Sequence, residues 1–133
     1  MGFSLHPELS ASIEDYLEAI LVLSEAHGAV RVTDIAKKLD VAKPSVTAAV
    51  NTLKEMGLVT QERYGKVYLT PSGREHAVRI KRRHNALSAF LTEVLGVSED
   101  VADKDACLME HAISPETMEK LLLFLEKTLP SNK

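Results

Sequence analysis

The sequence predicts a mainly α protein, with an N-terminal winged helix-turn-helix followed by a helical second domain. Three observations predict this class. A long amphipathic segment comes first. Two shorter amphipathic segments, joined by a tight connection, follow it and end at Gly57. An alternating segment around Tyr64-Gly65 then predicts a β-hairpin. Three further apolar-periodic segments follow, so the expected order is three helices, a hairpin and three more helices.

The first three helices each have an apolar stripe and a recognisable end. The first is expected at about 12–26 and ends at His27-Gly28. Thr33 is the expected N-cap of a short second helix. Pro44 opens the third helix, and Gly57 ends it. The residues expected to face the core are Ile13, Leu17, Ile20, Leu21, Leu23, Ile35, Ala36, Leu39, Val46, Ala49, Val50 and Leu53.

The second half contains three more predicted helices. Thr70-Pro71-Ser72 caps a helix that runs to about Leu95, before Gly96. A fifth helix covers about 98–113, and Ser114-Pro115 begins the sixth. The apolar residues of the sixth helix face a core or a partner: Met118, Leu121, Leu122, Phe124, Leu125 and Leu129. We therefore expect a DNA-binding domain over residues 1–71 and a helical domain over residues 72–133.

Composition and charge narrow the class of protein. Of the 133 residues, 45% are hydrophobic and only 5% aromatic, which predicts an aliphatic core. No apolar run is long enough to cross a bilayer, and a single cysteine excludes an internal disulfide, so we expect a cytoplasmic protein with no membrane partner. The net charge of −3 argues against nucleic-acid binding at first. However, residues 73–84 carry five basic groups and one acidic group, next to an acidic C-terminal half.

The third helix has the character of a DNA-recognition helix. In a winged helix-turn-helix, the second helix of the pair enters the major groove, and small polar side chains allow a close approach. Lys43 lies at its entrance and suits contacts with phosphates, whereas Arg63 and Lys66 flank the hairpin tip and suit contacts with the DNA backbone or the minor groove. The other candidate contacts are Pro44, Ser45, Thr47, Ala48 and Asn51. A generic three-helix subdomain or a protein-binding module would give the same spacing.

The fifth helix gathers metal-type donors on one face. Cys107, Glu110 and His111 are spaced i, i+3 and i+4, and Asp103 and Ser114 share their side. The opposite side carries the apolar residues Ala102, Leu108, Met109, Ala112 and Ile113. A thiol, a carboxylate and an imidazole together can hold a transition metal.

Two other helices supply matching donors. Asp15 and Glu18 lie one turn apart, opposite the apolar stripe of the first helix. His84 interrupts an apolar stripe on the fourth helix, where its polar nitrogens need partners. Taken alone, each of these is more often a surface charge or a core histidine. Their combination favours a bound metal, and a nearly filled coordination sphere argues against a catalytic metal, which needs an open position.

Five segments in order make the sequence resemble the diphtheria toxin repressor and manganese transport regulator family. They are "IEDYLEAILVL" (13–23), "VTDIAKKLDVAKPSVTAAVNTLKEMGLV" (32–59), "LTPSGREHA" (69–77), "KRRHNALSAFL" (81–91) and "DACLMEHAIS" (105–114). The resemblance implies a homodimer with a helical dimerisation domain, which binds a palindromic DNA operator and uses Mn²⁺ or Fe²⁺ as corepressor. It also implies that the third, SH3-like domain of longer members is absent.

The resemblance assigns the metal ligands by position. Asp15 and Glu18 match the carboxylates of manganese-type members, and the ligands His84, Glu110 and His111 match as well. Cys107 instead matches the iron type, whereas the iron type has methionine at the place of Asp15. The site therefore resembles a hybrid, and Ser88 stands where the iron type has a carboxylate of an ancillary site.

These patterns predict a repressor of metal-homeostasis genes, in which the metal bridges the DNA-binding and dimerisation domains. The paired carboxylates favour manganese, and the thiolate makes iron the next candidate. A winged-helix regulator that senses an organic ligand without metal is the alternative. A metal-dependent hydrolase would need a general base, and no residue with suitable spacing is available.

Overall fold

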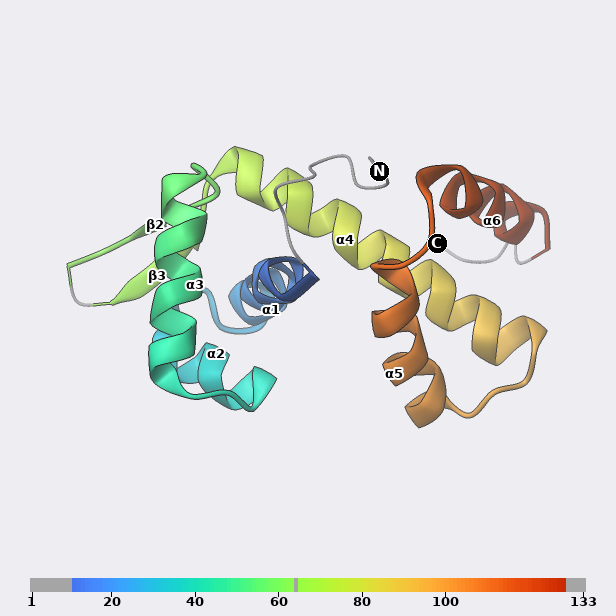
Figure 1. The fold of residues 1–133 in the computed structure, drawn as a ribbon, viewed down its shortest axis with the longest axis horizontal. Coiled ribbons are helices and arrows are strands. Elements are labelled where there is room, and N and C mark those ends of the chain that lie inside the picture. The colour runs from blue at the N-terminus through green and yellow to red at the C-terminus, as the bar shows by residue number, and fades with distance from the viewer. Residues whose placement is uncertain (1–10, 64, 129–133) are drawn as a thin grey trace. The chain divides into compact units, whose positions relative to one another are not determined.

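The computed structural model describes residues 11–63 and 65–128 (Figure 1). The chain folds as two compact units that divide inside one long helix, between Arg79 and Ile80. Within the described ranges, no helix is both long and apolar enough to cross a membrane.

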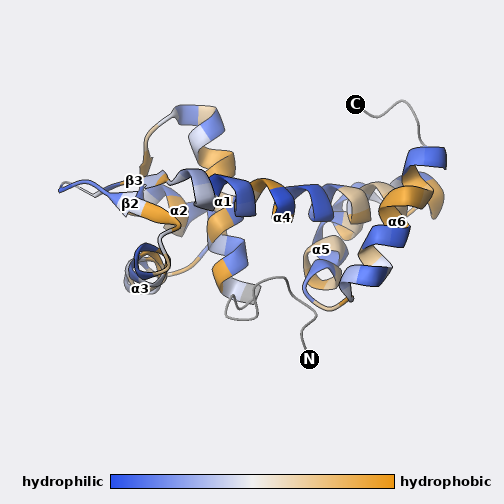
Figure 2. Ribbon diagram, turned by 90° about the horizontal axis from the view of Figure 1, so that it is seen from above, coloured by the Kyte–Doolittle hydropathy of each residue, from blue (hydrophilic) through white to orange (hydrophobic). Residues whose placement is uncertain are grey.

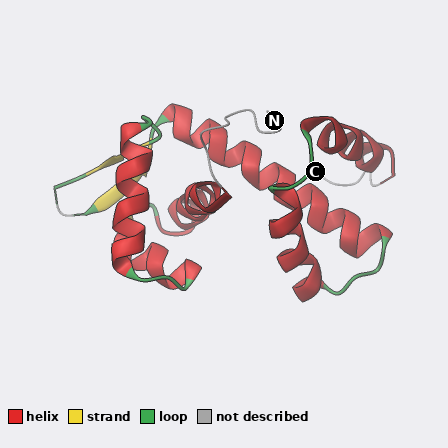
Figure 3. Cartoon of the chain, in the orientation of Figure 1, coloured by secondary structure: helices red, strands yellow, loops and turns green. Residues whose placement is uncertain are grey.

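The first unit combines three helices, a small sheet and the start of a fourth helix (Figure 3). Its elements are α1 (Ala11–His27), β1 (Val30–Arg31), α2 (Val32–Leu39), α3 (Lys43–Glu55), β2 (Val59–Gln61) and β3 (Lys66–Leu69). The antiparallel strands are ordered β1-β3-β2, with Val30 paired to Val67 and Val59 paired to Leu69. The hairpin was predicted. The two-residue strand β1 was not, because it is too short to show alternation.

The core of this unit is aliphatic, as predicted. The whole α3 stripe is buried, and so are the residues of α1, α2 and β3 that face it. The residues that are almost fully buried are Leu17, Ile20, Leu21, Val30, Ile35, Val46, Val50, Leu53 and Val67. Burying one such side chain contributes about 1.5–3 kcal/mol, so this stripe fixes α3 against the unit and leaves its other face outside.

The start of α2 differs from the prediction. The helix begins at Val32, one residue before Thr33, so Thr33 is not its N-cap. Arg31 holds the cap position, and its backbone N–H donates a hydrogen bond to the Asp34 carboxylate (3.0 Å). A carboxylate in the first turn satisfies a backbone donor and favours the positive end of the helix dipole. The helix therefore starts earlier because Asp34 caps it from inside.

Thr70 ties the end of α3 to the start of α4 (Pro71–Ala89). Its hydroxyl donates to the Gly57 carbonyl (2.8 Å) and accepts the backbone N–H of Gly73 (3.0 Å). Its own N–H donates to the Leu58 carbonyl (3.0 Å). A Cβ atom on Gly73 would overlap that same carbonyl oxygen, so only glycine lets the helix start this close to the chain after α3.

The second unit contains the end of α4, a π-helical turn (Phe90–Val94), α5 (Glu99–Glu110) and α6 (Pro115–Thr128). Its core consists of Leu87, Leu91, Ala102, Ala106 and Met118, with further apolar residues packed around them. Figure 2 shows hydrophilic turns along α4, which contains the basic segment 73–84, and a mixture of apolar and hydrophilic turns on α6.

Three details of this unit differ from the sequence prediction. The fourth helix does not continue regularly to Leu95, because its last turn is π-helical. The fifth helix ends at Glu110 rather than near Ile113, and His111 is its C-cap. Leu108 was expected on the buried face of α5 but is 72% exposed. The cap of α6 is as expected: the Ser114 hydroxyl accepts the N–H of Thr117 (3.1 Å).

Candidate metal centre and DNA-binding surface

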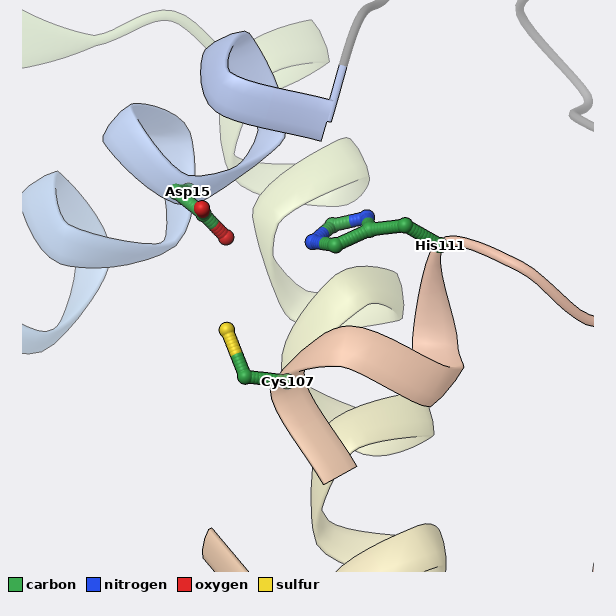
Figure 4. A group of neighbouring side chains, drawn as sticks. All are labelled: Asp15, Cys107 and His111. Atoms are coloured by element: carbon green, nitrogen blue, oxygen red, sulfur yellow. The ribbon is translucent and has the colours of Figure 1, made fainter. Parts of the chain in front are cut away.

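Cys107 and His111 lie one helical turn apart at the C-terminal end of α5. Figure 4 shows the thiol and the imidazole turned to the same side. The Cys107 sulfur and a His111 ring nitrogen lie within 4.8 Å of each other, close enough to bind one ion together. Both side chains are half-buried. Although α5 ends at Glu110, His111 stays beside Cys107 because this C-cap residue keeps right-handed helical dihedral angles.

Glu110 is the most unusual residue of this unit, because its carboxylate is fully buried. Its Oε1 lies 3.3 Å from Nδ1 of His84, and its Oε2 lies 3.4 Å from Nε2 of His111. These separations are short enough for ion pairing, but no described residue gives either oxygen a hydrogen bond of regular geometry. A buried carboxylate with poorly aligned donors is costly. Its lone pairs are thus available to a cation between the imidazoles.

His84 projects from α4 between the buried residues Ile80 and Leu87. Its side chain is only 15% exposed. Nε2 lies 2.8 Å from Oδ1 of Asp103, and Nδ1 faces Glu110. The expectation that a histidine in this stripe needs polar partners is therefore confirmed. The sequence predicts that Asp103 lies on the donor face of the fifth helix but indicates no role for it. The feature of the sequence that could have indicated a role for Asp103 is its position one helical turn before Cys107.

Asp15 and Glu18 lie on α1 in the first unit, one turn apart on one face, and both are half-buried. Figure 4 labels Asp15 on this helix. The structure thus groups four of the six predicted donors within the second unit. The remaining two form a pair on the first unit. None of the six is fully exposed, which is unusual for so many polar side chains. Within the second unit, the buried Glu110 carboxylate, two imidazoles and a thiol form a donor set that suits a divalent transition metal.

The outer face of α3 forms the predicted DNA-binding surface. The residues from the predicted set that are exposed on it are Lys43, Pro44, Ser45, Thr47, Ala48 and Asn51. Thr52 lies on the same face, but its hydroxyl donates to the Ala48 carbonyl (3.2 Å). Base contacts would therefore come mainly from Ser45, Thr47 and Asn51.

The hairpin between β2 and β3 forms the wing. Arg63 is exposed and Lys66 is half-buried; Tyr64, at the expected tip, lies outside the described residues. The Tyr68 hydroxyl donates to the Glu62 carboxylate (3.0 Å), and this hydrogen bond raises the pKa of Tyr68 above its usual value. The bond holds an acidic group close to the basic residues of the wing.

Comparisons with known families identify the protein family of this chain. The model "iron dependent repressor, N-terminal DNA binding domain" matches residues 8–67. The model "iron dependent repressor, metal binding and dimerisation domain" matches residues 70–129. The chain belongs to the iron-dependent repressor family. This confirms the resemblance to the diphtheria toxin repressor and manganese transport regulator family, and it confirms the winged-helix fold class. The predicted boundary after residue 71 stays a prediction: the two family models meet near it, whereas the compact units divide at Arg79.

Relatives of this repressor family cover most of the chain. An uncharacterized HTH-type transcriptional regulator of Methanocaldococcus jannaschii is 40% identical over 90% of this chain and 96% of that protein. The transcriptional regulator MntR of Escherichia coli is 38% identical over 86% of this chain and 74% of that protein. These relatives are DNA-binding regulators and not enzymes, so the prediction that the chain is not an enzyme is confirmed.

Solved structures give the same result. A manganese-dependent transcriptional repressor in complex with manganese is 32% identical, with a TM-score of 0.78, over 85% of this chain and 52% of that chain. The IdeR protein of T. acidophilum is 30% identical, with a TM-score of 0.75, over 86% of this chain and 53% of that chain. The repressor thus spans about half the length of these solved chains.

Proposed function

We propose that this chain is a transcriptional repressor that Mn²⁺ or Fe²⁺ activates by joining its two units. The observation that carries this proposal is the buried Glu110 carboxylate between His84 and His111, with Cys107 one turn away. The Glu110 carboxylate accepts no well-aligned hydrogen bond from any described residue. Asp15 and Glu18, on the first unit, are the donors proposed to complete the coordination.

The proposed mechanism is a shift between two populations. Without metal, the carboxylates of Asp15, Glu18 and Glu110 repel one another, so nothing favours one placement of the DNA-binding unit. Asp15 and Glu18 would hold a divalent cation together with His84, Cys107, Glu110 and His111, and the offset of their charges would favour the arrangement that brings both groups of donors together. A metal that binds this arrangement about 10⁴-fold more tightly moves the equilibrium from 1:99 to 99:1. The metal would supply charge and geometry, and no reaction takes place on it.

We propose that the competent state is a homodimer on a palindromic operator. The family model for the second unit describes a dimerisation domain, and the family is one of repressors. A two-fold dimer presents two recognition helices, which must be about 34 Å apart to enter successive major grooves. A metal that fixes α3 relative to the dimer core would set that spacing. Control of metal-homeostasis genes and a cytoplasmic location complete the proposal.

Manganese is the preferred candidate and iron the second. Oxygen donors favour Mn²⁺, and Asp15, Glu18 and Glu110 supply carboxylates. The Cys107 thiolate raises the affinity for Fe²⁺ and other softer metals. The similar solved structure of a manganese-dependent repressor in complex with manganese supports the first choice, whereas the family name refers to iron.

The test is a DNA-binding titration with metal. A duplex selected from a random pool in the presence of Mn²⁺ is labelled, and its anisotropy is measured against protein at fixed Mn²⁺, fixed Fe²⁺ under anaerobic conditions, or chelator. We expect metal to increase the affinity of the wild type at least 100-fold. His84→Ala and Glu110→Ala should abolish the increase, and Glu119→Gln, an exposed acid of α6, should retain it. Metal-independent binding that neither variant changes would overturn the proposal.

A further inference from the structure

We infer that Asp103 is a positioning residue that selects Nδ1 of His84 as the metal-binding atom. This inference rests on the proposed metal-activated function. The two ring nitrogens of His84 face two different carboxylates: Nε2 lies 2.8 Å from Asp103, and Nδ1 lies 3.3 Å from Glu110. Asp103 is not one of the six proposed ligands, and its side chain is 73% exposed.

The two carboxylates compete for one proton. A neutral imidazole has one N–H donor and one acceptor nitrogen, whereas an ionised carboxylate only accepts. If the proton is on Nδ1, it points to Glu110 and occupies the lone pair that a metal needs. If it is on Nε2, it is donated to Asp103, and Nδ1 presents its lone pair beside the buried Glu110 carboxylate. Only the second tautomer is ready to bind a metal there.

The geometry favours the tautomer with the proton on Nε2, which leaves Nδ1 able to bind a metal. The Asp103 contact meets the criteria of a hydrogen bond, and 2.8 Å is typical of one to a charged acceptor. The Glu110 contact does not meet them, because Oε1 accepts no regular hydrogen bond from any described residue. Asp103 therefore outcompetes Glu110 for the proton. It also fixes the rotation of the ring, as outer carboxylates commonly do for metal-binding histidines.

The sequence places Asp103 for this role. Asp103, Cys107 and Glu110 fall on one face of α5 at spacings of four and three residues, so one helix carries both the ligands and the group that orients a ligand on α4. Asp105 lies about 200° further around the same helix and is exposed. It provides a control with the same change of charge on another face.

The experiment uses the full chain, with Mn²⁺ as the probe, and compares wild type, Asp103→Ala, Asp103→Asn and Asp105→Ala. Outer-sphere partners of metal ligands are worth about 10–100-fold in metal affinity. Because Asp103 is largely exposed, we expect a loss near 10-fold in Asp103→Ala, measured by competition with a fluorescent chelator. Asn keeps an acceptor oxygen and should recover most of the loss. Asp105→Ala should match the wild type.

A second readout needs no metal. The ¹⁵N shifts of the His84 ring in chelator-treated protein report which nitrogen carries the proton. At a pH where the same shifts show that the ring carries a single proton, we expect Nε2–H in the wild type and in Asp103→Asn. Asp103→Ala should show protonation at Nδ1. The melting temperature of the metal-free protein should change little, which separates positioning from a loss of folding.

Three results would overturn the inference. The first is an unchanged Mn²⁺ affinity with unchanged ring shifts in Asp103→Ala. The second is an equal loss in Asp105→Ala, which would make the effect one of general charge. The third is one fewer bound ion per chain in Asp103→Ala, which would make Asp103 a ligand. Failure of the proposed function looks different, because DNA binding of the wild type would then ignore metal whatever the ring shifts show.

Discussion

Replacing Glu110 by glutamine should change stability in opposite directions with and without metal. In the metal-free protein, the substitution removes a fully buried charge and keeps the shape of the side chain. The new amide can donate to a neutral ring nitrogen of His84 or His111, which lie 3.3 and 3.4 Å from the present oxygens. Relieving an unsatisfied buried group is worth about 1–3 kcal/mol, so the metal-free variant should be more stable than the wild type by about that amount.

With metal, the order should reverse. A ligand at 100 times its Kd stabilises the folded state by about 2.7 kcal/mol. The wild type should gain this amount in Mn²⁺, whereas Glu110→Gln should gain little because an amide is a weak ligand. Urea unfolding of chelator-treated protein, with and without Mn²⁺, measures both free energies of unfolding. Asp105→Asn is the control and should leave both unchanged. A metal-free variant that is less stable than the wild type, with an undiminished gain from Mn²⁺, would refute this reasoning.

Three more predictions concern the site, the fold and the DNA-binding surface. Metal bound to Cys107 should shield its thiol, so a thiol reagent should modify the metal-free protein faster than the Mn²⁺-loaded protein, as absorbance of the released group would report. Gly73→Ala should lower the free energy of unfolding by about 1–3 kcal/mol in urea, because its Cβ overlaps the Leu58 carbonyl. In anisotropy measurements at several salt concentrations, Asn51→Ala should cost about 1–3 kcal/mol of preference for the selected duplex. Arg63→Ala should weaken binding to all duplexes and reduce the salt slope by about one.

Each of these has a contradicting outcome. Equal modification rates with and without metal would show that Cys107 is not a ligand. Wild-type stability in Gly73→Ala would show that the start of α4 can move away from Leu58. If Asn51→Ala weakened all duplexes equally, α3 would contribute no base recognition.

The sequence was a good guide wherever one periodic pattern determined the outcome. The α3 stripe, the presence of the hairpin and the Thr70 cap depend on local chemistry and were predicted correctly. The failures involve contacts that the periodic pattern does not reveal. The helix α2 starts one residue earlier than predicted because Asp34 caps it from its first turn. The prediction of Thr33 as N-cap did not take this carboxylate into account. The exposed Leu108 shows that an apolar residue need not face the core of its own unit.

The candidate site was predictable only in part. Spacing alone placed Cys107, Glu110 and His111 on one helix face, and the structure groups them with His84. Spacing could not show that Glu110 is buried without aligned donors, because that depends on how α4 packs on α5. Nor could it show the contact between Asp103 and His84, which are 19 residues apart.

The proposed function requires that metal couples the two units, so DNA binding must depend on the donors of the first unit. The Mn²⁺ dependence of binding to the selected duplex is compared for the wild type and the double variant Asp15→Asn/Glu18→Gln, which changes only the donors of the first unit. The wild type should bind at least 100-fold more tightly in Mn²⁺, whereas the double variant should stay at the metal-free affinity even when its second unit has bound metal. A double variant with the full response to Mn²⁺ would contradict the claim.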